Sequence, residues 1–554
     1  MILAFALLVV RLIFVQLGAA KPLSDIASSQ YKLAVSLLPK RGVIYDRNLK
    51  ELAISINLTS VFADPFKIKD KELAARKLSA ALGAGQAETY QKLSREKGFV
   101  WLARRVSPDK ARAVASLNIK GIDFIKEPQR VYPNGVMASH ALGFTDIDNN
   151  GLEGLELKFD KYLKGIPGWR YAVRDAKQRE VPGYNYKEIL PVDGDNLVLT
   201  IDSMVQALAE KELNNGFEKY HAKGGCVIVM DPYTGDILAL ANRPSYDPNN
   251  AQSAPADYRR NRAICDFFEP GSSFKIVAAS SLLEEKAVRP GDKFFCENGE
   301  YRWCGHTYHD HTAHGWLAFR DVIKYSSNIG TMKAAQKLGK DRFYKYIKKF
   351  GFGEKTGIDL PGEVNGVTRH PGTWSKLSLC SIAMGQEVTV TAIQLACAIS
   401  ALANGGNLVK PRIVQRIEAC SGHAIQVFEP KKPQRVISEA TAKEMRDILR
   451  SVVDDGTAQL AELEGYFPAG KTGTAQKVEP NGVYSHRKFT ASFIGFVPYD
   501  NPKFTIVVIM DEPRPIYYGG VVSAPVFKKI AGELMSYAKI QPKEPPQPRR
   551  LPTR

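Results

Sequence analysis

The 554-residue sequence has little cysteine, no internal repeat and only one long apolar run. Its seven cysteines are an odd number, so at least one thiol is unpaired and a disulfide framework is excluded. The absence of a repeat excludes solenoids and propellers. A mean hydropathy of −0.22 excludes a protein that crosses the membrane many times. With 44% apolar residues, the composition also excludes a mainly disordered, collagen-like or coiled-coil chain.

The charge is basic, with 76 Lys and Arg residues against 58 Asp and Glu residues and a net charge of +18. Such a balance favours anionic surroundings, for example nucleic acid, phospholipid head groups or wall polymers, without choosing among them. The basic residues are spread along the chain and form no recognised nucleic-acid-binding module. We therefore expect no nucleic-acid partner.

The apolar run covers residues 1–20 and is interrupted only by Arg11 and Gln16. About 20 apolar residues span a bilayer, so we predict a single-pass transmembrane anchor with the rest of the chain outside the cytoplasm. Two features oppose this prediction: Arg11 lies near mid-span, and no basic residue precedes the run. Two alternatives stay open. One is a signal peptide cleaved after Gly18-Ala19-Ala20, and the other is a late start that leaves Arg11 near the outer edge of the bilayer.

The region after the apolar run divides into a mixed stretch, about 40–190, and a more regular one from residue 196. The regular stretch predicts a strand at 196–202, hairpins at 225–231 with 236–241 and at 491–497 with 504–510, and helices at 203–218, 272–286 and 388–403. Hairpins near both ends, with helices between them, predict an α/β (α+β) domain whose antiparallel sheet is assembled from distant segments. The last 14 residues, 541–554, contain five prolines and predict a disordered tail.

Three short motifs are candidates for chemistry. In Glu269-Pro-Gly-Ser272-Ser-Phe-Lys275, a Pro-Gly turn precedes a helical pattern, so the side chains of Ser272 and Lys275 share one helical face and can meet. A desolvated lysine can take the proton of a serine, which is otherwise a poor nucleophile. The bare pattern carries little weight, because Ser-x-x-Lys also begins at Ser29, Ser94, Ser107, Ser485 and Ser536.

The second motif is Ser326-Ser-Asn328, whose Ser-x-Asn pattern also occurs at Ser55 and Ser116. The third is Lys-Thr-Gly, which occurs twice. The copy at Lys355 is surrounded by turn-forming residues and predicts a surface loop. The copy at Lys471 precedes the last hairpin, where an edge strand could present it to a cleft. There Gly473 would let a substrate backbone approach closely, and Lys471 would offer a positive charge to a carboxylate.

The three motifs in this order are the signature of serine penicillin-recognising acyl transferases. The chain resembles the class B penicillin-binding proteins, the monofunctional D,D-transpeptidases of bacterial wall synthesis. Further similar segments support the resemblance over about 40–535: Arg41–Asn48, Gly151–Glu156, Gly165–Gly168, Val229–Gly235, Asn261–Ala263 and Ala491–Phe496. The resemblance implies a multidomain α/β (α+β) fold with one N-terminal apolar helix. It predicts an anchor at 1–20, a mixed pedestal or dimerisation domain at 21–195, a penicillin-binding transpeptidase domain at 196–540 with helices flanking an antiparallel sheet, and a tail at 541–554.

By resemblance, Ser272 attacks the penultimate D-Ala carbonyl of a stem peptide that ends in D-Ala-D-Ala. Lys275 is the base, Ser326 relays the proton to the leaving amine, and Asn328 holds Lys275 and the substrate amide. A nearby second ammonium and partial burial are expected to disfavour the charged form of Lys275. An amine of a neighbouring stem peptide then resolves the seryl ester and completes a cross-link. β-Lactams acylate the same serine.

The resemblance assigns the substrate carboxylate to Lys471 with Thr472 and Thr474, beside Gly473. The backbone N–H groups of Ser272 and Thr474 would form the oxyanion hole. No metal or other cofactor is required. This chain departs from the family's pattern at Met384-Gly-Gln-Glu387, where many relatives have a Gly-x-Gly turn. We therefore assign no catalytic role to Gln386 or Glu387.

The expected partners are peptidoglycan stem peptides, β-lactams, a multi-spanning glycosyltransferase and other wall-synthesis or division proteins. The expected location is the periplasmic face of the bacterial cytoplasmic membrane. Motifs in the pedestal region and Ser-Ser-Asn favour the division-type, septal branch over an elongation-specific enzyme. The alternatives are a D,D-carboxypeptidase or β-lactamase-type hydrolase and a β-lactam sensor. A bifunctional synthase is disfavoured, because the stretch 40–190 is too short for a glycosyltransferase domain.

One segment is left without a function. Four of the nine histidines lie between His306 and His314, after Cys296 and Cys304. Their spacing matches no standard zinc finger, so we expect no metal and interpret the segment as a loop that can roof the cleft. Pairing of Cys296 with Cys304 in an oxidising compartment stays open.

Overall fold

The structure is a computed structural model that describes residues 2–18, 32–173 and 188–543. Its first helix, α1 (Ile2–Ile13), continues into a short π-helical segment, Phe14–Gly18. In these three ranges, no helix combines the length and the apolar character that crossing a membrane requires. The end of the predicted anchor (19–20) and nearly all of the predicted tail (544–554) lie outside the described residues.

A five-stranded antiparallel sheet forms the centre of the larger domain, in the order β10-β9-β21-β20-β19. Its strands are β9 (Gly224–Met230), β10 (Ile237–Arg243), β19 (Ala469–Val478), β20 (Tyr484–Val497) and β21 (Phe504–Asp511). Both predicted hairpins are confirmed, and they lie side by side although more than two hundred residues separate them in the chain. Strand β19, which carries Lys471, is an edge of the sheet.

Helices cover both faces of this sheet, which explains why its central strands β9 and β21 are apolar at nearly every position. On β9, Val227 packs in the cluster that contains α9 (Ser203–Lys219) and α19 (Gly519–Tyr537), whereas the adjacent Ile228 packs in the cluster that contains α17 (Ala392–Ala403). Every residue of α17 is buried. The predicted helix 388–403 begins late, because Thr391 and Gln394 form a capping box there.

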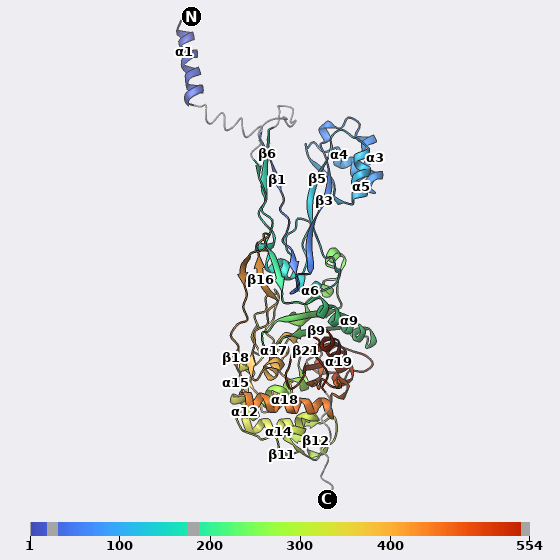
Figure 1. The fold of residues 1–554 in the computed structure, drawn as a ribbon, viewed down its shortest axis with the longest axis vertical. Coiled ribbons are helices and arrows are strands. Elements are labelled where there is room, and N and C mark those ends of the chain that lie inside the picture. Colours follow the sequence, from blue (N-terminus) through green and yellow to red (C-terminus); the bar gives the residue numbers. More distant parts are fainter. Residues whose placement is uncertain (1, 19–31, 174–187, 544–554) are drawn as a thin grey trace.

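A helical region lies beneath the sheet at the end of the molecule farthest from α1 (Figure 1). Its elements are η4 (Gly271–Phe274), α12 (Lys275–Glu284), α13 (Phe319–Lys324), α14 (Asn328–Leu338), α15 (Lys340–Lys349), α16 (Ser378–Ala383) and α18 (Glu439–Asp454). Short strand pairs accompany them: β11 (Lys293–Phe295) with β14 (Trp316–Ala318), β12 (Glu300–Trp303) with β13 (His306–His309), and β15 (Asn407–Leu408) with β18 (Gln434–Arg435). Two further short helices, α10 (Ala256–Arg259) and α11 (Arg262–Cys265), lie beside the N-terminal part of the chain, where Tyr258 O contacts the His140 ring.

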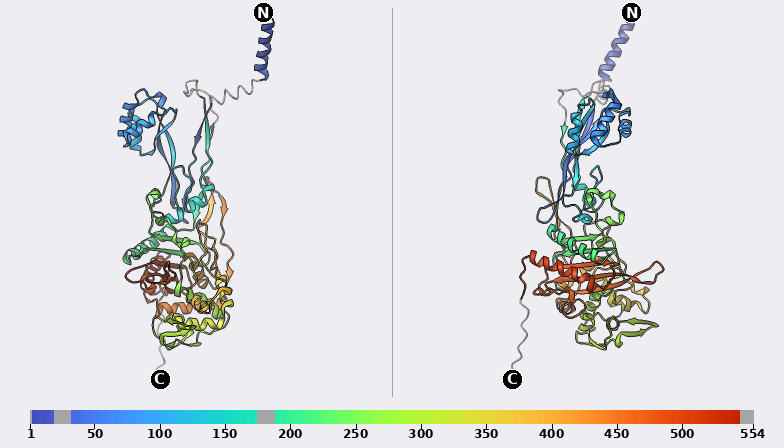
Figure 2. Two further views of the ribbon diagram at one scale, coloured as in Figure 1. Left: turned by 180° about the vertical axis from the view of Figure 1, so that it is seen from behind. Right: turned by 90° about the vertical axis from the view of Figure 1, so that its right-hand side faces the viewer.

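The N-terminal part extends from this domain as two arms, which the views in Figures 1 and 2 separate clearly. In one arm, β6 (Gly168–Val173) pairs with β1 (Lys32–Leu37) on one side and with β7 (Glu188–Ile189) on the other. The other pairs β3 (Glu51–Ala63) with β4 (Val100–Val106) and β5 (Ile122–Val131), and ends in α3 (Lys71–Leu82), α4 (Gln86–Leu93) and α5 (Pro108–Ser116). Short helices α6 (Ser139–Leu142), α7 (Gly154–Lys158) and α8 (Asp160–Leu163) lie near the base.

The two domains share a sheet. Strand β8 (Asn196–Leu199) pairs in parallel with β2 (Ile44–Tyr45) and antiparallel with β16 (Val414–Glu418), which pairs with β17 (Ala424–Val427). The predicted domain boundary after residue 195 therefore falls beside a strand that joins the pedestal to the domain of the five-stranded sheet.

Three segments of the predicted pedestal meet in a buried ion network. The Arg41 guanidinium donates to Glu156 Oε2 at 2.5 Å, and Arg130 Nε donates to Glu156 Oε1 at 2.6 Å. All three side chains are almost wholly buried. Burial raises the pKa of Glu156, but the Arg130 and Arg41 charges outweigh burial, so this pKa is lowered overall. The network joins the chain segment before β2 to helix α7.

Candidate active site

Ser272 lies in a tight turn at the start of a buried helix. The 3₁₀ turn η4 contains it, and the backbone N–H of Lys275 donates to Ser272 O as α12 begins. Gly271 has a positive φ of 52°, a conformation that favours glycine, and a Cβ there would lie 2.9 Å from Thr474 O. The Pro-Gly pair thus bends the chain so that the Ser272 turn packs against β19. The Ser272 side chain is half-buried.

Lys275 is fully buried and its amine is held by the second motif. Lys275 Nζ donates to Ser326 O at 2.6 Å and to Asn328 Oδ1 at 2.8 Å, and it lies 3.3 Å from Ser326 Oγ. The helix α12 from which it extends is buried at eight of its ten positions. The first and second motifs therefore converge, as the resemblance implies.

Lys471 reaches the same hydroxyl from the edge strand. Its Nζ donates to Ser326 Oγ at 2.9 Å and to Thr472 O at 3.2 Å, and its side chain is fully buried. The Ser326 hydroxyl thus lies between the amines of Lys275 and Lys471. Ser326 itself has a φ of 60°, in the left-handed region, directly before the N-cap of α14, Ser327.

Both amines are shifted toward their neutral form. Burial lowers the pKa of Lys275 to about 7, against the opposing charge of Asp310. Burial, followed by the charge of Lys275, lowers the pKa of Lys471 well below its ordinary value. The expected shift of Lys275 is therefore present, with burial as its main cause. A lysine that titrates near neutrality is suited to act as a general base.

One expected contact is missing. Within the described parts of the chain, no hydrogen bond joins the Ser272 hydroxyl to the Lys275 amine, because that amine is engaged by Ser326 and Asn328. The sequence places Ser272 and Lys275 on one helical face, but a 3₁₀ turn replaces the first α-helical turn, and Lys275 extends toward α14 instead.

Strand β19 brings the third motif to the Ser272 turn. A Cβ on Gly473 would lie 2.3 Å from Ser492 Oγ and 2.9 Å from Pro270 O, so the glycine allows the strand to pack against that turn. The two threonine hydroxyls of the third motif have partners within the protein. Thr472 Oγ1 lies 3.0 Å from Thr457 Oγ1, and Thr474 Oγ1 accepts from Gly519 N at 3.0 Å.

The competing copies of the motifs lie elsewhere. Lys355 is exposed in a loop, as predicted. Ser485 is buried, and its hydroxyl accepts from the backbone N–H groups of Arg487 and Lys488. Sequence reasoning missed Asp310, which contacts the start of α14. The only signal was an acidic residue inside the histidine-rich segment.

The histidine-rich segment does not gather its side chains at one point. His306 packs on Tyr308, His311 contacts Tyr518 edge-on, and His314 stacks on Tyr325. Among the described residues, no group of three or more His, Cys, Asp or Glu side chains is placed to hold a metal ion. All seven cysteines, which fall in the described ranges, are free; Cys296 is buried and Cys304 is exposed.

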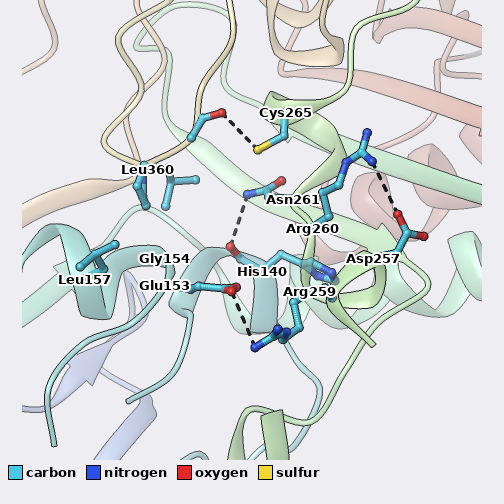
Figure 3. Close-up of a pocket in the computed structure, with 13 residues that line it drawn as sticks. His140, Glu153, Gly154, Leu157, Asp257, Arg259, Arg260, Asn261, Cys265 and Leu360 are labelled. Carbon is cyan, nitrogen blue, oxygen red and sulfur yellow. Dashed lines mark hydrogen bonds and ion pairs between the residues drawn. The ribbon is translucent and has the colours of Figure 1, made fainter. Parts of the chain in front are cut away.

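A separate cavity of about 550 Å³ lies where the pedestal meets the larger domain (Figure 3). His140 and Glu153 line it from the pedestal, and Arg259, Cys265 and Leu360 line it from the other side. In Figure 3 the Glu153 carboxylate points to Arg259, at 3.9 Å. The cavity shares no residue with the Lys275 cluster.

An α/β domain in which a Ser-x-x-Lys turn, a Ser-x-Asn turn and a Lys-Thr-Gly edge strand meet at one hydroxyl defines a serine penicillin-recognising acyl transferase. Comparison with known families agrees. Residues 225–532 match the penicillin binding protein transpeptidase domain, and residues 36–199 match the penicillin-binding protein dimerisation domain. The chain belongs to the class B penicillin-binding proteins, in their division-type branch. The resemblance and the predicted fold class are confirmed.

Individual relatives are similar over most of their length. Stage V sporulation protein D of Bacillus subtilis is 35% identical, over 98% of this chain and 85% of its own. The peptidoglycan D,D-transpeptidase FtsI of Escherichia coli is 33% identical, over 91% of this chain and 84% of its own. The crystal structure of penicillin binding protein 3 from Mycobacterium tuberculosis, complexed with aztreonam, has a TM-score of 0.73 and 29% identity. It covers 92% of this chain and 99% of that chain.

Proposed function

We propose that this protein cross-links peptidoglycan stem peptides as a serine D,D-transpeptidase in septal wall synthesis, and that β-lactams acylate it. The observation that carries the proposal is the Ser326 hydroxyl between two buried amines, 2.9 Å from Lys471 Nζ and 3.3 Å from Lys275 Nζ, beside the turn of Ser272. The enzyme class agrees with the transpeptidase domain match and with relatives named as D,D-transpeptidases.

In the acylation step, Ser272 Oγ bonds to the carbonyl carbon of the penultimate D-Ala and its proton passes to Lys275. The bond to the terminal D-Ala nitrogen breaks, and that amine receives a proton through Ser326. Asn328 holds Lys275 through its side-chain oxygen, as in the free protein. The tetrahedral oxygen would be stabilised by the N–H groups of Ser272, in the 3₁₀ turn, and of Thr474, on an edge strand that can offer its N–H groups to a ligand.

In the second step, an amine of another stem peptide attacks the ester carbonyl, the bond to Ser272 Oγ breaks, and the serine regains its proton. Lys471, Thr472 and Thr474 are proposed to hold the terminal carboxylate of the donor. Thr472 and Thr474 would then exchange their present partners, Thr457 and Gly519 N, for substrate oxygens. Gly473 keeps the strand close enough to the Ser272 turn for both steps.

We also propose the predicted organisation: an anchor at 1–20, a pedestal at 21–195, a transpeptidase domain at 196–540 and a tail at 541–554. The anchor would hold the enzyme at the periplasmic face of the cytoplasmic membrane, where stem peptides are exposed. The apolar side chains of α1, such as Ile2 and Leu3, are strongly exposed, which supports a lipid-facing role. Glycan strands would come from a multi-spanning glycosyltransferase partner, with other wall-synthesis or division proteins.

The test is to incubate the purified full chain with un-cross-linked glycan strands that carry pentapeptide stems, and to analyse digested products by mass spectrometry. We expect cross-linked dimers together with free D-Ala, and neither product from Ser272→Ala. Release of D-Ala without dimers would indicate a carboxypeptidase and overturn the transpeptidase assignment. For the septal role, depletion should block division and give filaments; rounded cells would instead indicate elongation.

A further inference from the structure

The histidine-rich segment contains one acidic side chain, and it lies against the active site. Asp310 follows strand β13 directly and is half-buried. Its Oδ1 accepts from the backbone N–H groups of Asn328 and Ile329, the latter at 3.0 Å. Its Oδ2 accepts from the Ser327 hydroxyl at 2.5 Å. One carboxylate thus contacts three consecutive residues at the start of α14.

These contacts satisfy the first turn of the helix. The N-terminal N–H groups of a helix have no partner inside the helix, and a negative charge there is stabilised by the helix dipole. Ser327 caps one of them by accepting from Gly330 N at 2.9 Å, and Asp310 accepts from two more. The loop and the helix are therefore joined at the point where the Ser-x-Asn motif begins.

The same loop orients the Asn328 amide. Asn328 Nδ2 donates to His309 O at 2.9 Å, while Asn328 Oδ1 accepts from Lys275 Nζ at 2.8 Å. An amide held at both ends cannot rotate its oxygen away from the lysine without losing both bonds. The carbonyl of His309 thus decides which end of the amide faces Lys275.

Ser326 depends on the same restraint. Its backbone is in the left-handed region, which a serine adopts only when its neighbours hold it there. On the C-terminal side, its two neighbours, Ser327 and Asn328, are both bonded to Asp310. In this conformation the Ser326 carbonyl meets Lys275 Nζ, and its hydroxyl meets Lys471 Nζ.

We propose that Asp310 is a positioning residue for acyl transfer: through Ser327 and Asn328 it holds the Ser-x-Asn turn in the orientation that both lysines need. The inference rests on the proposed function and adds a residue to it. Asp310 is not a catalytic residue, because its carboxylate contacts the helix terminus and none of the groups assigned to the reacting atoms.

The negative charge of Asp310 also acts on the pKa of Lys275, which can be measured independently of the maximal acylation rate. Three titratable groups act on Lys275 or lie beside it: Asp310, whose negative charge raises its pKa; Cys296, a thiol whose own pKa is raised by burial; and the buried Lys471. Removing the Asp310 charge therefore lowers the pKa of Lys275 further. A carboxylate that stabilises the fold far from Lys275 leaves this pKa in place.

The experiment measures the acylation rate constant of the full chain with a fluorescent penicillin as a function of pH. Asp310→Ala should reduce the high-pH plateau at least about tenfold, because three bonds to the turn are lost. Asp310→Asn keeps an acceptor for the backbone N–H groups, so its plateau should stay within about threefold of the wild-type value. In both variants the midpoint of the profile should move to lower pH.

A matched control is Asp70→Ala, which removes a carboxylate that caps α3 in the pedestal and should change neither plateau nor midpoint. If Asp310→Ala does not fold, the midpoint of Asp310→Asn decides. An unshifted midpoint in Asp310→Asn, or a wild-type plateau in Asp310→Ala, would overturn the inference while labelling at Ser272 persists. Penicillin adduct in Ser272→Ala would instead reject the proposed function, so the two failures are distinguishable.

Discussion

Lys471 Nζ lies 2.9 Å from Ser326 Oγ, although 145 positions separate these residues in the chain. Lys471 comes from the edge strand β19, whereas Ser326 comes from the turn before α14 in the helical region. The cluster of Lys275, Ser326 and Lys471 therefore lies where the sheet meets the helices.

The pH dependence of acylation should report the Lys275 amine. Burial lowers its pKa to about 7, and only the neutral amine can accept the Ser272 proton. We expect the acylation rate constant to rise with pH, with a midpoint near 7, and to fall about tenfold for each pH unit well below it. Stopped-flow or gel-based labelling between about pH 5 and pH 9 measures this. A rate independent of pH over that range would contradict the assignment of Lys275 as the base.

Lys471→Met should separate stability from activity. The buried amine is costly to desolvate, so replacing it with an apolar side chain of similar length should stabilise the fold by about 1 kcal/mol. Loss of its bond to Ser326 should reduce the acylation rate constant about 100-fold. Thermal unfolding and penicillin labelling measure the two effects. The control is Lys355→Met, in the exposed copy of the motif, which should change neither the stability nor the acylation rate constant. A wild-type rate constant in Lys471→Met would contradict the proposed role of Lys471.

Gly473→Ala should disturb the contact between β19 and the Ser272 turn. The new methyl group would lie 2.3 Å from Ser492 Oγ and 2.9 Å from Pro270 O, so the strand must move away. We expect the acylation rate constant to fall at least about tenfold. Gly98→Ala, where a Cβ meets no atom within 4 Å, should be neutral. Equal rates in the two variants would show that the close approach of the strand is not needed.

Particular helices and strands show which parts of the fold can be predicted from the sequence. The local patterns predict both hairpins and the helices α9, α12 and α17 to within a few residues, because alternation and helical periodicity depend on burial alone. The pairing of β21 with β9, which brings the hairpins together, depends on contacts across the chain. So does the parallel pair β2 and β8, which the prediction assigned to different domains.

In the active site, too, some features can be predicted from the sequence and others depend on contacts across the chain. The three motifs and their convergence follow from order and resemblance, but the engagement of Lys275 by Ser326 and Asn328 does not, because it depends on the 3₁₀ turn at Ser272. Asp310 was not predicted, since a loop residue acquires its partners only when β13 packs beside α14. The sequence predicts that Gly473 leaves room for a substrate backbone. In the structure, the protein's own Pro270 and Ser492 lie next to the position that a side chain would take.

Glu156→Gln should destabilise the pedestal without touching the cleft. The change leaves the buried Arg130 without its counter-charge and leaves Arg41 with only the partly exposed Asp160, which should reduce the free energy of unfolding by about 3 kcal/mol. Because the pKa of Glu156 is lowered in the fold, its stabilisation is present above its unfolded pKa and is lost as the pH falls. Calorimetry measures both effects. The control Glu88→Gln breaks an exposed pair with Lys92 and should have little effect; equal losses would contradict the account.

The central claim is that Ser272, and no other serine, forms the covalent adduct. The direct measurement is labelling of the full chain with a fluorescent penicillin, with peptide mapping of the modified residue, in the wild type, Ser272→Ala and Ser485→Ala. Ser485 begins a second Ser-x-x-Lys pattern, but its hydroxyl is buried and bonded to backbone amides. We predict a single adduct on Ser272, which is lost in Ser272→Ala and retained in Ser485→Ala. Adduct that persists in Ser272→Ala would contradict the account.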